Sequence, residues 1–147
     1  MAMRIVNHRL DLATKGRTDI IDITAEVAMI LETSGVTEGH VLLFVPGSTA
    51  GLTTIEYESG AVADLREAIE RLIPEGKHYR HDARWGDGNG YAHVRAALLG
   101  PSLGVPVMGG RLALGTWQQI VLVDFDNRPR RRRIIVQVCG QGGDSPG

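Results

Sequence analysis

The chain gathers titratable and amide side chains in one short segment. Three of its five histidines fall between positions 78 and 93, with acidic and amide residues between them: His78, His81, Asp82, Asp87, Asn89 and His93. Histidine titrates near neutral pH, so paired histidines suit proton transfer or metal binding. We therefore place the functional centre at residues 81–100.

This segment also contains three glycines within residues 86–90, which let the backbone approach a ligand closely. A helix is expected to begin at or just after Asn89, so that its free N–H groups form a site for phosphate or pyrophosphate. Asp87 is then placed to hold a Mg²⁺ ion that accompanies the phosphates. The alternative is structural, because Asp-Gly and Asn-Gly are common turn dipeptides and Asn89 is a suitable helix cap.

His93 lies one helical turn after Asn89 and flanks an expected apolar face at Val94, Ala97 and Leu98. This position predicts a partly buried, fixed general acid or base, with His81 converging on it. A metal site of His81, His93 and a carboxylate such as Asp87 stays open as an alternative. The spacing does not match the histidine pair of a metalloprotease helix.

Two further candidates come from the segment FVPGSTAGLTTIEYE. Ser48 and Thr49 follow a buried strand and are expected to contact substrate. Glu56 is surrounded by apolar residues, and burial would raise its pKa and suit it to acid–base catalysis. The alternative for Glu56 is an exposed carboxylate on a strand.

Four consecutive arginines occupy positions 130–133. Alternate side chains, Arg130 and Arg132, are expected to clamp phosphate and to lie near Asp124. A solvated edge or salt bridges between subunits is the alternative. In the segment GTWQ, Trp117 and Gln118 are expected either in a pocket wall or in ordinary core.

The composition predicts one globular domain at residues 1–140, followed by a frayed tail at 141–147. The chain has 147 residues, of which 43% are hydrophobic and 22% charged. Its formal charge of -1 gives no general attraction to nucleic acid or membranes. The single cysteine excludes an internal disulfide. With no apolar run of ~18 residues and no signal peptide pattern, we expect a cytoplasmic protein.

Apolar periodicity predicts the elements that position these residues. Strands are expected at 5–12, 20–23, 40–46, 53–58, 105–108, 111–125 and 133–138. Helices are expected from a Thr24 cap to Ser34, from Val62 to Ile73, and from Asn89 to Leu99, with a polar loop before the last one. Because helices do not separate the strands regularly, we expect an α+β fold with a largely antiparallel sheet or sandwich and two to three helices.

Several segments, in this order along the chain, together resemble the YjbQ family, described as secondary thiamine-phosphate synthase enzymes. They are FVPGSTAGLTTIE, the Pro74…Tyr79…His81 spacing, DGNGYAH, LLGPSLGVPV, GRLALGTWQQIVLVDFD and RPRRRR. The polar positions that match are Thr49, Glu56, His81, Asp87, Asn89, His93, Trp117 and Gln118. Many members carry His-Thr-Thr or His-Thr-Ser where this chain has Gly47-Ser48-Thr49, so one family histidine is absent and a three-histidine metal site is disfavoured.

The resemblance implies a compact α+β domain that assembles as a homotrimer with sites near subunit boundaries. It also implies an activity that joins hydroxymethylpyrimidine pyrophosphate to thiazole phosphate. Our leading hypothesis is therefore an enzyme acting on a small phosphorylated substrate, with Mg²⁺ favoured over Zn²⁺ as the metal. The alternatives are a metal-dependent hydrolase using His81 and His93, and a small-molecule-binding protein without catalytic activity.

Overall fold

The computed structural model describes residues 2–142, in which eight strands and four helices form an α+β domain. The strands are β1 (Met3–Thr14), β2 (Asp19–Asp22), β3 (Val36–Phe44), β4 (Ala50–Ile55), β5 (Ser102–Met108), β6 (Arg111–Leu112), β7 (Gln119–Asp124) and β8 (Arg130–Gly142). The helices are α1 (Thr24–Ser34), α2 (Ser59–Leu72), α3 (Arg80–Trp85) and α4 (Gly90–Leu99). None of the described helices is long and apolar enough to span a bilayer.

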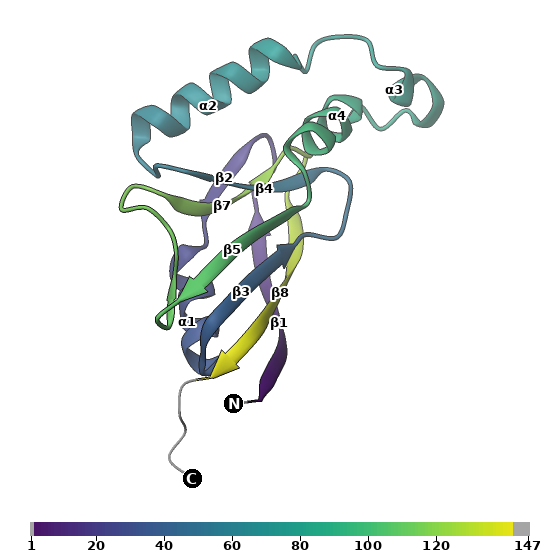
Figure 1. Cartoon of the computed structure of the whole chain (residues 1–147). Helices are drawn as coiled ribbons and strands as arrows, with labels where there is room; N and C mark the ends of the chain where they lie inside the picture. Colours follow the sequence, from purple (N-terminus) through teal and green to yellow (C-terminus); the bar gives the residue numbers. More distant parts are fainter. Residues whose placement is uncertain (1, 143–147) are drawn as a thin grey trace.

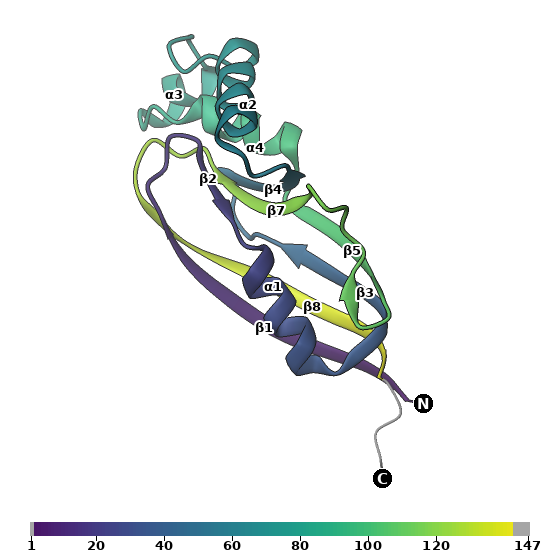
Figure 2. The same ribbon diagram turned by 90° about the vertical axis from the view of Figure 1, so that its left-hand side faces the viewer.

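The strands form two antiparallel sheets, as expected from the sequence. The large sheet has the order β1-β8-β3-β5-β6 and the small sheet the order β2-β7-β4. Helices α2, α3 and α4 gather at the end of the molecule next to the small sheet (Figure 1). Helix α1 lies against the large sheet nearer the opposite end, where β1 begins and β8 ends (Figure 2).

Strand β7 is apolar from Ile120 to Val123 because both faces of the small sheet are buried there. Ile120 and Leu122 face the core shared with α1 and the large sheet. Val121 and Val123 face a second core beneath α2 and α4. This arrangement holds the small sheet between two packed layers, so the polar residues at its ends are positioned rigidly.

Strand β8 is longer at both ends than its pattern predicts. It pairs with β1 from Thr14↔Arg130 to Met3↔Gln141, so its arginines belong to the sheet rather than to a turn. Residues 141 and 142, expected to fray, are part of the strand. The rest of that expected tail, 143–147, lies outside the described residues.

The single strand predicted at 111–125 is wrong. It divides into β6, which belongs to the large sheet, and β7, which belongs to the small one. The intervening segment turns at Gly115, whose N–H donates to the side chain of Gln118 at 3.0 Å. Leu112 and Leu114 still pack on the core, which explains why the alternation continued across the break.

Three smaller expectations also need correction. Strand β4 begins at Ala50, earlier than predicted. Thr24 is not the cap of α1 but its first helical residue, since Ile23 occupies the cap position, and the Thr24 N–H donates to Asp22 Oδ1 at 2.9 Å. The polar loop expected before α4 contains the short helix α3, which ends at Gly86 in a left-handed conformation with φ of 71°.

Candidate functional site

One end of the small sheet brings most of the expected site residues together. Strand β4 begins and β7 ends there, because Ala50 is paired with Asp124. The backbone N–H of Phe125 donates to the carbonyl of Thr49 at 2.9 Å, which ties the segments flanking these strands. Strand β8 begins at the same end, and α4 packs against β4. Backbone pairing therefore fixes the position of this site.

Asp124 is fully buried where β7 ends. It accepts a hydrogen bond from Thr14 Oγ1 at 2.6 Å, and Arg132 reaches both its oxygens, through Nε at 2.7 Å and Nη2 at 2.8 Å. A buried carboxylate needs such partners to remain charged. The expectation that Arg132 lies near Asp124 is confirmed.

Asp126 is also fully buried and forms the centre of a second set of hydrogen bonds. It accepts from Thr49 Oγ1 at 3.0 Å, Arg130 Nε at 2.8 Å and Asn89 Nδ2 at 3.4 Å. Burial pushes the pKa of Asp126 upward, but hydrogen bonds from Thr49, Asn127 and Arg130 outweigh it and hold the pKa below its usual value. Asp126 therefore stays ionised and organises the site.

The arginine run divides between the two faces of the sheet, as alternation requires. Arg132, with a side chain 10% exposed, connects Asp124 to Thr49, to which its Nη2 donates at 2.7 Å. Arg133 points to the other face, where it pairs with Asp11 and remains 58% exposed. Arg132 thus lies on the side of the buried carboxylates, whereas Arg133 lies on the solvated side, and phosphate binding by the run stays a prediction.

His81 and His93 meet although they lie on different helices. Their ring centroids are 4.2 Å apart, with an interplanar angle of 40°. His81 comes from α3 and His93 from the first turns of α4. Burial, and secondarily the nearby His81, lower the pKa of His93. The convergence predicted for these two residues is confirmed, and His93 is neutral at neutral pH.

The start of α4 is not an open anion site. The N–H of Gly90 already donates to Asp82 Oδ1 at 2.8 Å. Asn89 does not cap the helix with its side chain, and turns instead toward Asp126. A Cβ at position 90 would lie 2.6 Å from Tyr79 Cβ, so the chain requires glycine there. Part of the helix end is therefore satisfied by the protein itself.

The candidate metal-binding group contains Asp82, which was not among the ligands proposed from the sequence. A ligand atom of His81, of Asp82 and of Asp87 all lie within 4.8 Å of one another. His81 Nδ1 is 3.5 Å from Asp82 Oδ1 and 3.4 Å from Asp87 Oδ1. His93 does not belong to this group, so the expected set of His81, His93 and Asp87 is corrected to one containing Asp82.

A pocket of about 220 Å³ opens beside His93. Its lining consists of Gly47, Ser48, Ala50, His93, Ala96, Ala97 and Pro101. Gly47 has a φ of 124°, and a Cβ on it would lie 3.3 Å from Arg132 Nη1. The guanidinium of Arg132 therefore lies close to Gly47, one of the residues that line this pocket, and it also bonds to Thr49.

The apolar face expected on α4 is wrong. Val94 is 41% exposed and Leu98 75% exposed, and Ala97 lines the pocket. The helix buries Tyr91, Ala92, Arg95 and Ala96 instead. His93 is nevertheless half-buried, because it packs against His81 and borders the pocket.

Three expected site residues lie at the other end of the small sheet. Ile55, the last residue of β4, is paired with Gln119, about 17 Å along the strand from Ala50. Glu56 follows it and is exposed, so the burial expected for Glu56 is wrong. Trp117 is 72% exposed, and Gln118 Nε2 donates to Thr54 Oγ1 at 3.1 Å. This set therefore lies at the opposite end of the small sheet from the Ala50–Asp124 pair.

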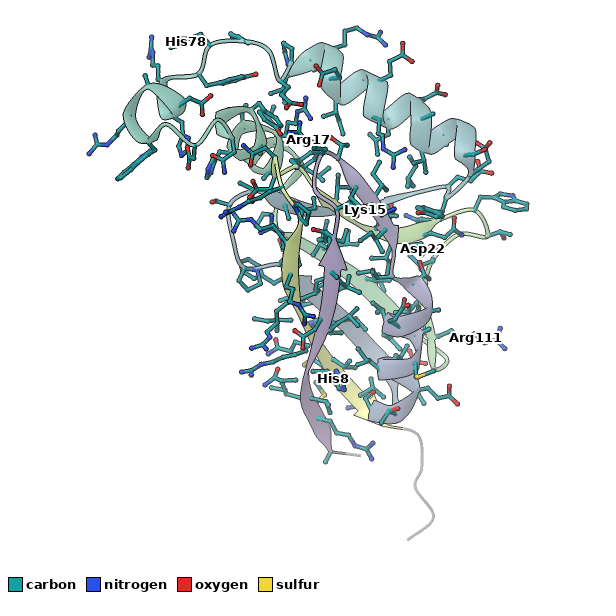
Figure 3. All side chains as sticks on the ribbon, turned by 180° about the vertical axis from the view of Figure 1, so that it is seen from behind. His8, Lys15, Arg17, Asp22, His78 and Arg111 are labelled. Carbon is teal, nitrogen blue, oxygen red and sulfur yellow. The ribbon has the colours of Figure 1, made fainter. Side chains whose placement is uncertain are left out.

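His78, the third histidine of the segment, is exposed on the connection between α2 and α3 and lies at the outer edge of the helical end (Figure 3).

The comparison with protein families covers nearly all of the described chain. The family described as UPF0047 protein YjbQ-like matches residues 8–141. The chain belongs to this family. A UPF0047 protein of Archaeoglobus fulgidus is 46% identical over 128 residues, which are 87% of this chain and 97% of that protein. The UPF0047 protein YugU of Bacillus subtilis is 37% identical, over 89% of this chain and 97% of its own.

Solved structures of the YjbQ-like family have the same fold. A YbjQ-like protein of unknown function from Sulfolobus solfataricus superposes with a TM-score of 0.90 at 33% identity, covering 95% of this chain and 100% of that one. An uncharacterised member from Clostridium acetobutylicum gives 0.82 at 32% identity, covering 89% and 98%. The α+β class expected from the sequence is thus confirmed.

Sequence reasoning missed the structural importance of two acidic residues, Asp82 and Asp126, in this YjbQ-like chain. Neither residue is among the candidate ligands or catalytic groups selected from the sequence. Asp124 and Asp126 do carry a signal, because they alternate with apolar residues in VLVDFD, where a charge requires a buried partner. No comparable pattern marks Asp82, whose role depends on how α3 packs against α4.

Proposed function

We propose that the protein is an enzyme that binds a small phosphorylated substrate in the pocket between Gly47, His93 and Arg132. The single observation that carries this proposal is that Arg132 Nη1 lies beside Gly47, which lines the same pocket as His93. Guanidinium groups bind phosphate oxygens well. Arg132 is held rigidly by Asp124, so its orientation is fixed before a ligand arrives.

The glycine at position 47 widens this pocket. A larger side chain, such as the histidine common in the family, would occupy space next to Arg132 Nη1. In this chain the phosphate group takes that space and contacts Arg132 and Ser48. We therefore expect recognition by charge and hydrogen bonds at this position.

The histidine pair supplies proton transfer in this proposal. His93 borders the pocket and is neutral, because burial and His81 lower its pKa. His81 stacks on the other side, where its Nδ1 faces two carboxylates. A proton passes from the histidine pair to the departing pyrophosphate and is replaced from solvent, because the attacking thiazole nitrogen carries no proton for a base to accept.

The reaction class we propose is transfer to a nucleophile with loss of pyrophosphate, as in thiamine-phosphate formation. A carbon–oxygen bond of hydroxymethylpyrimidine pyrophosphate breaks, and a carbon–nitrogen bond forms to thiazole phosphate. Pyrophosphate departs with the bonding electron pair, and Arg132 neutralises its charge. This choice of substrate rests on the family resemblance, and the charge neutralisation rests on Arg132.

A divalent cation is consistent with the residues present. Asp82 and Asp87 offer carboxylate oxygens and His81 a ring nitrogen, all within 4.8 Å. Carboxylate oxygens are the protein ligands that Mg²⁺ prefers, whereas the imidazole suits transition metals better. When bound, such an ion neutralises phosphate charge.

The test is synthesis of thiamine phosphate by the purified chain from the two phosphorylated precursors, with Mg²⁺ present. We expect a loss of about 100-fold or more in His93→Gln. The matched control is His78→Gln, which changes an exposed histidine outside the pocket. Turnover by the wild type equal to buffer would exclude this reaction. Calorimetric titration with pyrophosphate then separates a phosphate-binding protein without this activity from one that does not bind.

Metal-dependent hydrolysis is the second candidate, and the group of His81, Asp82 and Asp87 favours it. Its test is hydrolysis of p-nitrophenyl phosphate with Mn²⁺ or Zn²⁺ added to metal-free protein. Asp87→Asn should remove both metal binding and hydrolysis, while Asp64→Asn, an exposed change on α2, should affect neither. Hydrolysis that persists in excess chelator would contradict this candidate.

We further propose that the active form is a homotrimer in which the end carrying Glu56, Trp117 and Gln118 lies beside the His93 end of a neighbouring subunit. The family resemblance supports the trimer. The 72% exposure of Trp117 and the separation of the two sets in one subunit support the arrangement. In it, Glu56 reaches the substrate only from the neighbour.

A further inference from the structure

A second pocket, of about 200 Å³, lies on another side of the helical layer. It is formed where α2 and α4 meet the turn between β1 and β2, and its lining is Arg17, Thr18, Arg66, Glu70, Glu75 and Arg95. It shares no residue with the pocket of His93. Every residue that lines it is charged or polar, and we refer to it as the arginine pocket.

Arg95 forms the rigid base of the arginine pocket. Its side chain is only 3% exposed, and it forms an ion pair with Glu70. It also donates through Nη1 to Thr18 Oγ1 at 3.0 Å and through Nε to the carbonyl of Ile73 at 2.9 Å. Its guanidinium lies 4.8 Å from the centre of the Tyr91 ring. A buried charge held by this many contacts keeps one orientation.

Arg66 contributes hydrogen-bond donors that the protein does not use. Its Nε donates to the carbonyl of Thr18 at 2.9 Å. Within residues 2–142 its two terminal amino groups donate to no protein acceptor. Arg17 Nη1 pairs with Glu75 Oε1 at 2.6 Å on the exposed side. Three guanidinium groups thus face two carboxylates, which leaves one positive charge in excess.

The backbone at the edge of the arginine pocket is strained. Arg17 and Thr18 have φ angles of 52° and 60°, a region that a β-branched residue such as threonine rarely adopts. The turn is held by Arg17 N–H, which donates to the carbonyl of Asp126 at 2.6 Å, and by the bonds of Thr18 to two arginines. Such strain persists only where surrounding contacts impose it, and it is concentrated at binding sites.

We propose that the arginine pocket binds a small oxyanion, with the terminal amino groups of Arg66 as its principal donors and Arg17 closing over it. Phosphate and carboxylate present the same paired oxygens to a guanidinium, so both belong to this class. The excess positive charge selects an anion, and the volume limits it to a small group. Figure 3 shows Arg17 next to the helical end of the molecule.

The experiment is an NMR titration of the whole chain with inorganic phosphate and, separately, with acetate, at ionic strength held constant with chloride. We expect saturable shifts of the Thr18 amide and the Arg66 Nε–H signals with at least one of the two anions. The arm that saturates at lower concentration identifies phosphate or carboxylate as the ligand. Signals of Ser48 and His93 report the other pocket in the same spectra, so the two sites are resolved independently.

Arg66→Ala should weaken binding at the arginine pocket at least 10-fold without changing shifts at Ser48. Arg71→Ala is the matched control, because Arg71 is exposed on the same helix and pairs only with Glu67. Absence of saturable shifts at Thr18 and Arg66 in the wild type with both anions overturns the proposal. Equal binding by wild type and a folded Arg66→Ala variant also overturns it.

Discussion

Arg132 reaches both carboxylate oxygens of Asp124, through Nε at 2.7 Å and Nη2 at 2.8 Å, inside the protein. This pair connects the end of β7 to the start of β8 and also directs Arg132 toward Thr49. The pair therefore both stabilises the fold and orients Arg132 for the proposed phosphate site.

Replacing Arg132 should destabilise the fold strongly. Arg132→Met leaves the fully buried Asp124 without its cation, which costs about 3–5 kcal/mol in free energy of unfolding. The neighbouring Arg133→Met breaks only an exposed pair with Asp11 and should cost about 1 kcal/mol or less. Urea unfolding of the two variants measures the difference. Equal losses would contradict the division of the arginine run between faces.

His93 should titrate below the ordinary histidine value of 6.5, because burial and His81 disfavour its protonated form. Since the folded pKa is lowered, the stability from this group is fully present above pH 6.5 and is lost as pH falls through the folded pKa. NMR titration of the His93 ring measures this. In His81→Asn the pKa of His93 should rise. A pKa unchanged by that substitution would show that His81 does not act on it.

Tyr91→Phe should stabilise the protein or leave it unchanged. The Tyr91 hydroxyl is fully buried and has no hydrogen-bond partner within the described residues. Removing it relieves a desolvation penalty of about 1 kcal/mol. Tyr79→Phe is the control, since Tyr79 donates to the carbonyl of Pro74 and should lose about 1 kcal/mol. Thermal unfolding measures the stability of both variants, and an equal loss of stability in the two would refute this prediction.

Trp117→Ala should weaken the proposed trimer while each subunit stays folded. Trp117 is 72% exposed, so its loss should change subunit stability by about 0.5 kcal/mol or less. A tryptophan at an interface commonly contributes about 2 kcal/mol, which raises the concentration needed for assembly at least 10-fold. Sedimentation of Trp117→Ala, with exposed Met29→Ala as control, tests this. A monomeric wild type at all concentrations would rule out the trimer.

The sequence predicted elements well where one period governed a whole segment. Helix α2 covers nearly all of the segment predicted from its apolar period, and β1 contains the whole strand predicted at 5–12. It failed where one period crossed two elements, as at 111–125, because Leu112 and Leu114 pack on the same core that β7 covers. Helix α3 was missed because its six residues are too few and too polar for an apolar period.

The sequence was a better guide to which residues form the candidate site than to the contacts these residues make. His81 contacts His93 as expected, and Arg132 bonds to Thr49, but Asn89 turns toward Asp126. The bond between Asp82 and Gly90 depends on the packing of α3 against α4, which no local pattern expresses. The burial of Glu56 was predicted from its apolar neighbours in sequence. Those neighbours do not bury it, because β4 ends at Ile55 and Glu56 lies beyond the strand.

The four arginines of β8 have a consequence for how the strand finds its alignment. A slip of one residue would exchange Arg132 for another arginine, and Ile134 for Ile135, so the site end of β8 barely distinguishes the two alignments. The correct alignment of β8 is therefore distinguished mainly in its C-terminal half. There Val136 and Val138 are buried, and Gln137 bonds to Asn7 on β1. The accuracy of the site is thus decided several residues away from it, and substitutions near Gln137 would misplace Arg132 without touching it.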